Sequence, residues 1–191
     1  MKEKLANEIA NLIANAVIDL PKDVEDALRK AMENEEEPAK TQLKAILKNI
    51  ELARQQRKPM CQDTGTPTFY VEMGYNFPYK DVIREAIIEG VRKATKEVPL
   101  RPNAVDILTG KNSGDNTGLH IPYINWELVD GEECKITVMP KGGGSENMST
   151  LKMLKPGVGI KGVKKFVLEW MVEAAGNPCP PTVVGIGIGG G

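Results

Sequence analysis

The sequence predicts an α+β protein in which N-terminal helices precede a mainly antiparallel sheet flanked by helices. Apolar residues recur at three- and four-residue steps through the first third of the chain, the spacing that gives a helix one apolar face. Segments rich in β-branched and aromatic residues follow from about residue 68, and a further apolar helical pattern occupies about residues 160–175. Helices first and strands later are typical of the α+β class.

Residues 1–58 are expected to form three helices. The first has an apolar face made by Leu5, Ile9, Leu12, Ile13, Ala16 and Val17. Pro21 would end this helix, and Asp23 is a candidate N-cap for the second. A third helix is expected to begin near Pro38 and to stop before Pro59. We therefore take residues 1–58 as an N-terminal helical segment.

Residues 59–191 are expected to form an α+β catalytic region that packs as one unit with the helical segment. Residues 68–77 are typical of a strand, and residues 81–96 of an amphipathic helix. Residues 119–139 predict two strands that pair as a hairpin around Asp130-Gly131.

The C-terminal part of the chain begins with the apolar helix of about residues 160–175. Gly176 is expected to end that helix in a left-handed conformation. Residues 182–191, TVVGIGIGGG, then predict an apolar strand that runs into glycines. Free chain ends are usually polar, so we expect the chain to be cut short here and the catalytic region to be incomplete.

Composition and charge exclude several classes of partner. The 191 residues are 41% hydrophobic, but no apolar run approaches the roughly 18 residues of a membrane span. Glu8, Asn11 and Asn15 interrupt the apolar N-terminus, unlike the core of a secretory signal. The 25 basic residues nearly balance the 26 acidic ones, so neither nucleic acid nor an anionic membrane is indicated. We expect a cytoplasmic protein.

Residues 59–67, PMCQDTGTP, concentrate a thiol, an amide, a carboxylate and hydroxyls in one predicted loop. Cys61 lies in this loop, and Cys179 lies between prolines that fix its backbone. Either thiol could be a small, inert apolar residue. Zinc usually requires a close pair of cysteines, which this chain lacks, whereas an iron–sulfur cluster accepts thiolates far apart in sequence. Two rigid loop cysteines therefore favour a cluster over zinc.

Two other residues of metal-binding type are expected to be structural. Cys134 lies in a predicted strand, where packing explains it. His120, the single histidine, lies between apolar neighbours in another predicted strand. The final GIGIGGG outlines a dinucleotide-binding loop, but no helix follows it, so that signal is weak.

Four motifs, CQDTGT, GKNSGDNTG, KGGGSEN and GNPCPPTVVGIGIGG, resemble in this order those of class I fumarate hydratases and L-tartrate dehydratases. The resemblance is to the α subunit or N-terminal domain, apparently truncated, and extends from about Leu43 to the end. It implies a [4Fe-4S] cluster held by three cysteines. Cys61 and Cys179 match two of these ligands, and the third would lie beyond Gly191.

The resemblance also implies a substrate site. Gln62, Asp63, Arg101 and Gly144 match residues that bind the small dicarboxylate substrate, and Asp63 is expected to act as the catalytic acid or base. The chemistry is consistent with these roles, because negative charge that grows on a dianion needs cationic stabilisation and a guanidinium binds a carboxylate in bidentate fashion. An ordinary turn at Asp63, a surface role for Arg101 and a tight turn at Gly144 remain alternatives.

We therefore expect a subunit of an iron–sulfur hydro-lyase that reversibly hydrates fumarate to L-malate. The alternatives are an L-tartrate dehydratase subunit and a non-catalytic scaffold fragment. A β subunit or C-terminal domain would complete the active site, and a homo- or hetero-oligomer is expected. This chain alone is expected to be inactive.

Overall fold

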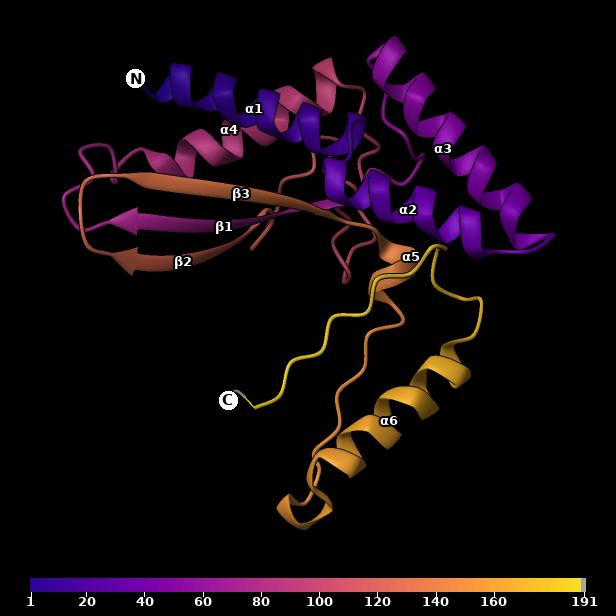
Figure 1. Cartoon of the computed structure of the whole chain (residues 1–191). Coiled ribbons are helices and arrows are strands. Elements are labelled where there is room, and N and C mark those ends of the chain that lie inside the picture. Colours follow the sequence, from indigo (N-terminus) through magenta and orange to yellow (C-terminus); the bar gives the residue numbers. More distant parts are fainter. Residues whose placement is uncertain (190–191) are drawn as a thin grey trace. The chain divides into compact units, whose positions relative to one another are not determined.

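The computed structural model describes residues 1–189, and the chain divides into two compact units (Figure 1). The first unit is Met1–Lys141, and the second begins at Gly142. The α+β class is confirmed. The three helices before residue 58 belong to the first unit together with the sheet. The boundary expected at residue 58 stays a prediction.

Most elements of the first unit agree with the sequence-based expectations. They are α1 (Lys2–Ile18), α2 (Lys22–Asn34), α3 (Ala39–Gln56), β1 (Thr66–Gly74), α4 (Ile83–Glu97), β2 (Tyr123–Val129) and β3 (Cys134–Lys141). The second unit holds α5 (Gly143–Glu146), the 3₁₀ turn η1 (Pro156–Val158) and α6 (Gly159–Ala174).

The hydrophobic core lies where α1 and α4 cover one face of the sheet (Figure 1). Alternate residues of β1 point to this face, so Phe69 and Val71 are buried while Tyr70 is exposed. Ile13 of α1 and Ile87 of α4 are also fully buried. The apolar faces predicted from helical spacing therefore form the core.

The strand order is β2-β1-β3, with β1 parallel to β2 and antiparallel to β3. The expected hairpin between β2 and β3 is wrong, because β1 lies between them. The four residues that join β2 to β3 cross the end of β1, where the Gly74 amide donates to the Glu133 carbonyl at 2.8 Å. A Cβ at Gly74 would lie 2.4 Å from the Gly131 oxygen. β1 is the most buried of the three strands, and in the central position both of its edges are paired.

Several predicted element ends are also wrong. Asp23 does not cap α2, because Pro21 precedes that helix and no side chain hydrogen-bonds its end. The residue with positive φ after α6 is Ala175, not Gly176. Residues 182–189 form no strand and are exposed, and the last two residues of that prediction lie outside the described part of the chain.

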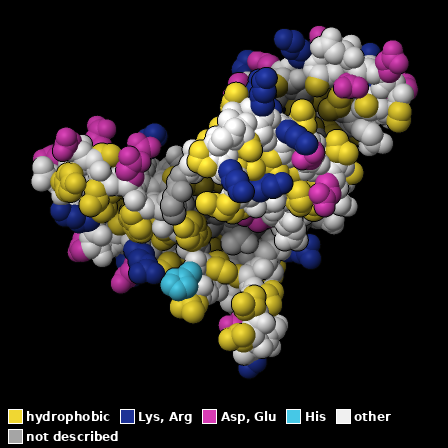
Figure 2. Space-filling view, turned by 90° about the horizontal axis from the view of Figure 1, so that it is seen from below, with side chains coloured by type: hydrophobic (Ala, Val, Ile, Leu, Met, Phe, Trp, Pro, Cys, Tyr) yellow, Lys and Arg dark blue, Asp and Glu magenta, His cyan; other side chains and the backbone are white. Residues whose placement is uncertain are grey.

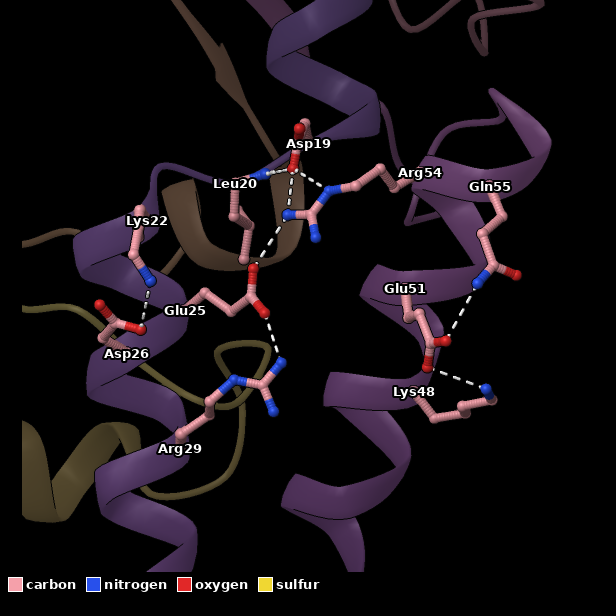
Figure 3. A network of polar contacts seen from close by, with 10 residues as sticks. All are labelled: Asp19, Leu20, Lys22, Glu25, Asp26, Arg29, Lys48, Glu51, Arg54 and Gln55. Carbon is pink, nitrogen blue, oxygen red and sulfur yellow. Dashed lines mark hydrogen bonds and ion pairs between the residues drawn. The ribbon is translucent and has the colours of Figure 1, made fainter.

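An ionic network joins α2 to α3 (Figure 3). The Arg54 guanidinium of α3 donates to Asp19 Oδ1 through Nε and to Glu25 Oε2 of α2 through Nη2, each at 2.9 Å. The Arg54 hydrogen bonds lower the pKa of both carboxyl groups. Because α2 has no fully buried residue, this network contributes to its attachment.

Apolar side chains remain at the surface of both units (Figure 2). The most exposed include Ile107, Leu108 and Leu119 of the first unit and Met153 and Val183 of the second. Within residues 1–189, no helix is both long and apolar enough to cross a membrane.

Candidate active site

The loop that carries Cys61 is fixed before it reaches the thiol. Helix α3 ends at Gln56, and Arg57 adopts a left-handed conformation that turns the chain away. The Met60 amide then donates to the Val17 carbonyl at 3.0 Å, and Asn49 Nδ2 donates to the Met60 carbonyl at 2.6 Å. Cys61 follows directly and is exposed, with its thiol outside any disulfide.

A surface hollow of about 760 Å³ lies in front of this loop. Its lining residues are Asn49, Lys58, Pro59, Met60, Cys61, Gln62, Thr64, Pro99 and Arg101. Three predicted site residues, Cys61, Gln62 and Arg101, are thus brought together although 40 positions separate the first from the last. Two cations and no carboxylate line the hollow, so it favours an anionic ligand.

Three polar residues of this lining were not predicted to be site residues. Lys58 and Thr64 flank the cysteine motif, and their proximity to Cys61 is the signal that could have identified them. Asn49 lies on α3, eleven positions before Met60, and nothing in its surroundings distinguishes it from a surface residue of an amphipathic helix.

Arg101 lies in an irregular segment after α4. No ion pair of its guanidinium is found within the described residues, and the side chain is exposed. Its backbone is held, because the Arg101 amide donates to Thr64 Oγ1 at 3.0 Å and its carbonyl accepts from Asn116 Nδ2 at 3.1 Å. The loops of Cys61 and Arg101 are therefore joined.

Asp63 points toward its own loop and is not among the residues lining the hollow. Its Oδ1 accepts from the Gly65 amide at 3.1 Å and from Asn103 Nδ2 at 3.0 Å. These contacts orient the carboxylate and match the turn-forming role that Asp often plays. Its predicted catalytic role stays a prediction.

The second compact unit carries the other predicted residues, Gly144 and Cys179. Cys179 is exposed and outside any disulfide. A Cβ at Gly144 would lie 3.2 Å from Cys179 Sγ, so the absence of a side chain at Gly144 makes room for this thiol. The glycine motif and the cysteine motif of this unit therefore meet.

Cys134 and His120 differ in their environments. Cys134 of β3 packs against the core, and burial raises the pKa of its thiol, which disfavours the thiolate. His120 is exposed in a turn before β2, with φ of 60°, so its predicted placement in a strand is wrong. Within residues 1–189, no three His, Cys, Asp or Glu side chains gather closely enough to hold a metal ion.

The donor chemistry of Cys61 and Cys179 nevertheless fits a cluster. Both thiols are exposed in loops, neither forms a disulfide, and the space beside Cys179 would be reduced by any side chain at Gly144. Thiolates are the ligands that iron–sulfur clusters require.

The chain is similar to known proteins along most of its length. A family model described as "Fumarate hydratase (Fumerase)" matches residues 6–191. A Methanocaldococcus jannaschii protein, provisionally named L(+)-tartrate dehydratase subunit alpha, is 51% identical over 176 residues, which are 90% of this chain and 62% of that relative. The L(+)-tartrate dehydratase subunit alpha of Escherichia coli K12 is 36% identical over 171 residues, 88% of this chain and 56% of the relative.

This chain therefore spans less than two thirds of the length of these relatives. The family match covers nearly all of it, including the four motifs and every predicted site residue. The chain belongs to the fumarate hydratase (fumerase) family.

Proposed function

We propose that this chain is part of a hydro-lyase that removes water from L-tartrate, as its alpha subunit. The observation that carries the proposal is the cationic hollow beside an exposed thiol, in a chain 51% identical to a protein provisionally named as an L(+)-tartrate dehydratase subunit alpha. Fumarate hydration, the first expectation from sequence, is the second candidate, and the name of the matching family favours it.

Three side chains of the hollow have chemistry suited to a dicarboxylate. The Arg101 guanidinium can bind one carboxylate with two parallel hydrogen bonds, and the Lys58 ammonium can attract the other. Gln62 can donate its amide hydrogens to a carboxylate or hydroxyl oxygen. These contacts would hold the substrate and stabilise the charge that grows beside a carboxylate as a proton leaves.

We propose Asp63 as the residue that moves this proton. Its Oδ1 is oriented by two donors, which would keep the carboxylate in one position during the reaction. An Asp63→Asn variant that loads iron normally should lose nearly all turnover. Near-normal turnover by this variant would rule the role out.

We further propose that Cys61 and Cys179 hold a [4Fe-4S] cluster together with a third thiolate from outside this chain. When bound, the cluster would supply a Lewis-acidic iron that weakens the carbon–oxygen bond of the leaving hydroxyl. The site would be completed by sequence beyond this chain or by a second subunit, since the relatives are named as alpha subunits. The three unpaired cysteines favour a reducing compartment such as the cytoplasm.

The ligand assignment can be tested by iron content. The complete protein with its partner subunit is reconstituted with iron and sulfide without oxygen, as wild type and as Cys61→Ala, Cys179→Ala and Cys134→Ala. The first two variants should lose iron, and Cys134→Ala is the matched control that should keep it. Full iron loading of the first two would overturn the assignment.

The substrate assignment needs a separate measurement on the loaded wild type. We expect release of oxaloacetate from L-tartrate at a higher kcat/KM than release of fumarate from L-malate. The opposite order would favour the fumarate reading. A loaded protein that acts on neither substrate would be a scaffold.

A further inference from the structure

The segment 100–103, which presents Arg101, has no helical or strand hydrogen bonds yet is held closely. The Arg101 amide donates to Thr64 Oγ1, and Asn116 Nδ2 donates to the Arg101 carbonyl at 3.1 Å. Two residues later, the Asn103 amide donates to Asn116 Oδ1 at 2.7 Å. Side chains thus take the place of secondary structure on both sides of the arginine.

Asn116 is the centre of these contacts. Its side chain is fully buried, and its φ of 59° lies in the left-handed region that asparagine tolerates better than most residues. Its Nδ2 also donates to Thr95 Oγ1 of α4 at 3.2 Å, and that hydroxyl donates to the Val91 carbonyl at 2.8 Å. Asn116 therefore connects the segment to a helix of the hydrophobic core.

Asn103 connects the same segment to the loop of the cysteine motif. Its Nδ2 donates to Asp63 Oδ1 at 3.0 Å and to the Gly65 carbonyl at 3.2 Å. The segment around Arg101 is thus hydrogen-bonded to the core through Asn116 and to the loop that carries Cys61 through Asn103. Neither Asn116 nor Asn103 is among the residues lining the hollow.

We propose that Asn116 and Asn103 are positioning residues that hold Arg101 beside Cys61 and Gln62, ready for a substrate carboxylate. A guanidinium on an unrestrained loop would lose conformational entropy at each binding event, and prior fixation removes that cost. The role in substrate affinity rests on the proposed function, whereas the fixation of the segment does not.

Three variants of the complete protein with its partner subunit test this inference. Asn116→Gly removes the buried side chain and introduces glycine, which adopts a positive φ without steric strain. Asn103→Ala changes a less buried residue, and it replaces Asn116→Gly in the test if that variant does not fold. Ile13→Ala, in the core of α1, is the matched control, because it lowers stability without touching the segment.

The first readout is hydrogen exchange of residues 100–104, followed by mass spectrometry. We expect exchange to rise at least about tenfold in both asparagine variants, with no comparable rise in Ile13→Ala. Unchanged exchange in both asparagine variants would overturn the fixation itself. This readout needs neither substrate nor cluster.

The second readout is calorimetric titration with succinate, a dicarboxylate that cannot lose water, together with KM and kcat for L-tartrate. The succinate dissociation constant and KM should rise about tenfold in both asparagine variants. In Asn116→Gly kcat should change less than KM, whereas Asn103→Ala also removes a donor to Asp63 Oδ1 and should lower kcat as well. A freed segment with unchanged affinity would overturn the positioning role. If the wild type neither binds succinate nor turns over a substrate, the proposed function is wrong. Hydrogen exchange alone would then test whether the two asparagines fix the segment.

Discussion

Gly65, within the cysteine motif, shows why that motif contains glycine. Its φ is +73°, and a Cβ there would lie 2.8 Å from the backbone of Lys141 on β3. The Gly65 amide also donates to Asp63 Oδ1, and its carbonyl accepts from Asn103. Glycine at this position therefore lets the loop approach β3 while it makes both hydrogen bonds.

Gly65→Ala should lower the free energy of unfolding by about 2–5 kcal/mol, the sum of left-handed strain and steric overlap. Gly110→Ala is the matched control, because Gly110 has a similar φ of +66° but nothing near its added Cβ. That control should cost only about 1–2 kcal/mol. Urea unfolding of the two variants measures the difference, and equal costs would mean that the contact with Lys141 is unimportant.

At the scale of helices, α1 and α4 approach closely at Gly90. A Cβ on Gly90 would lie 2.6 Å from Ile9 Cγ2 and 3.0 Å from the Ala6 carbonyl oxygen. Alanine is favoured over glycine in an isolated helix by about 1 kcal/mol, but overpacking a core costs about 1–3 kcal/mol. The close contact should therefore outweigh the helical preference.

Gly90→Ala should thus destabilise the protein by up to about 2 kcal/mol, against its helix propensity. In an Ile9→Ala background, which removes Cγ2 but keeps the Cβ that would lie 2.8 Å from the added atom, the same change should cost less than it does in wild type. A double-mutant cycle from urea unfolding measures this coupling. Additive effects of the two substitutions would contradict the proposed contact.

The α2–α3 network should make stability depend on pH through Asp19 and Glu25. Both have a pKa lowered in the folded state, so their stabilising effect is present above the unfolded values near 4 and is lost as the pH falls through the folded values. Arg54→Gln should lower the urea midpoint at pH 7, and this difference from wild type should shrink at a pH well below 4, as the lowered folded-state pKa values are crossed.

Arg84→Gln is the control for loss of one positive charge, because no ion pair of Arg84 is found in the described part of the chain. Its urea midpoint should stay near that of wild type at both pH values. The Arg54→Gln difference should also shrink in about 1 M salt, since the network is exposed. A difference that persists unchanged at low pH would show that packing, and not charge, carries the effect.

At the scale of the whole molecule, exposed apolar side chains are the main feature. Helix α6 has an apolar sequence, but only Ala174 is fully buried, and Leu168 and Val172 are 63% and 81% exposed. Apolar groups at this exposure are typical of surfaces that another chain or segment covers. The relatives are longer than this chain and are named as subunits.

We expect this chain to associate in solution, with a mass above the 20.9 kDa of one copy. Light scattering after size-exclusion chromatography measures the mass. Leu168→Gln together with Val172→Gln should weaken association if α6 takes part, whereas Lys161→Gln, on the same helix, should not. A monomer at tens of micromolar would contradict this prediction.

Local sequence predicted much of the fold because helices and strands have short periods. The three N-terminal helices, α4, α6 and strand β1 all follow from apolar spacing within about 20 residues. Asp130-Gly131 also predicted a turn at the correct position. It did not reveal that Gly74 lies beneath that turn, because strand order depends on packing between distant segments.

The sequence by itself determined the helical segments and the α+β class, since residue type and spacing are local properties, and its family resemblance predicted Cys61, Gln62 and Arg101 as site residues. Only the tertiary structure decided that β1 lies between β2 and β3, and that buried Asn116 ties Arg101 to the core. The physical reason is that hydrogen bonds between irregular segments have no period in the chain. They form where packing against α4 and the cysteine loop brings their donors and acceptors within reach.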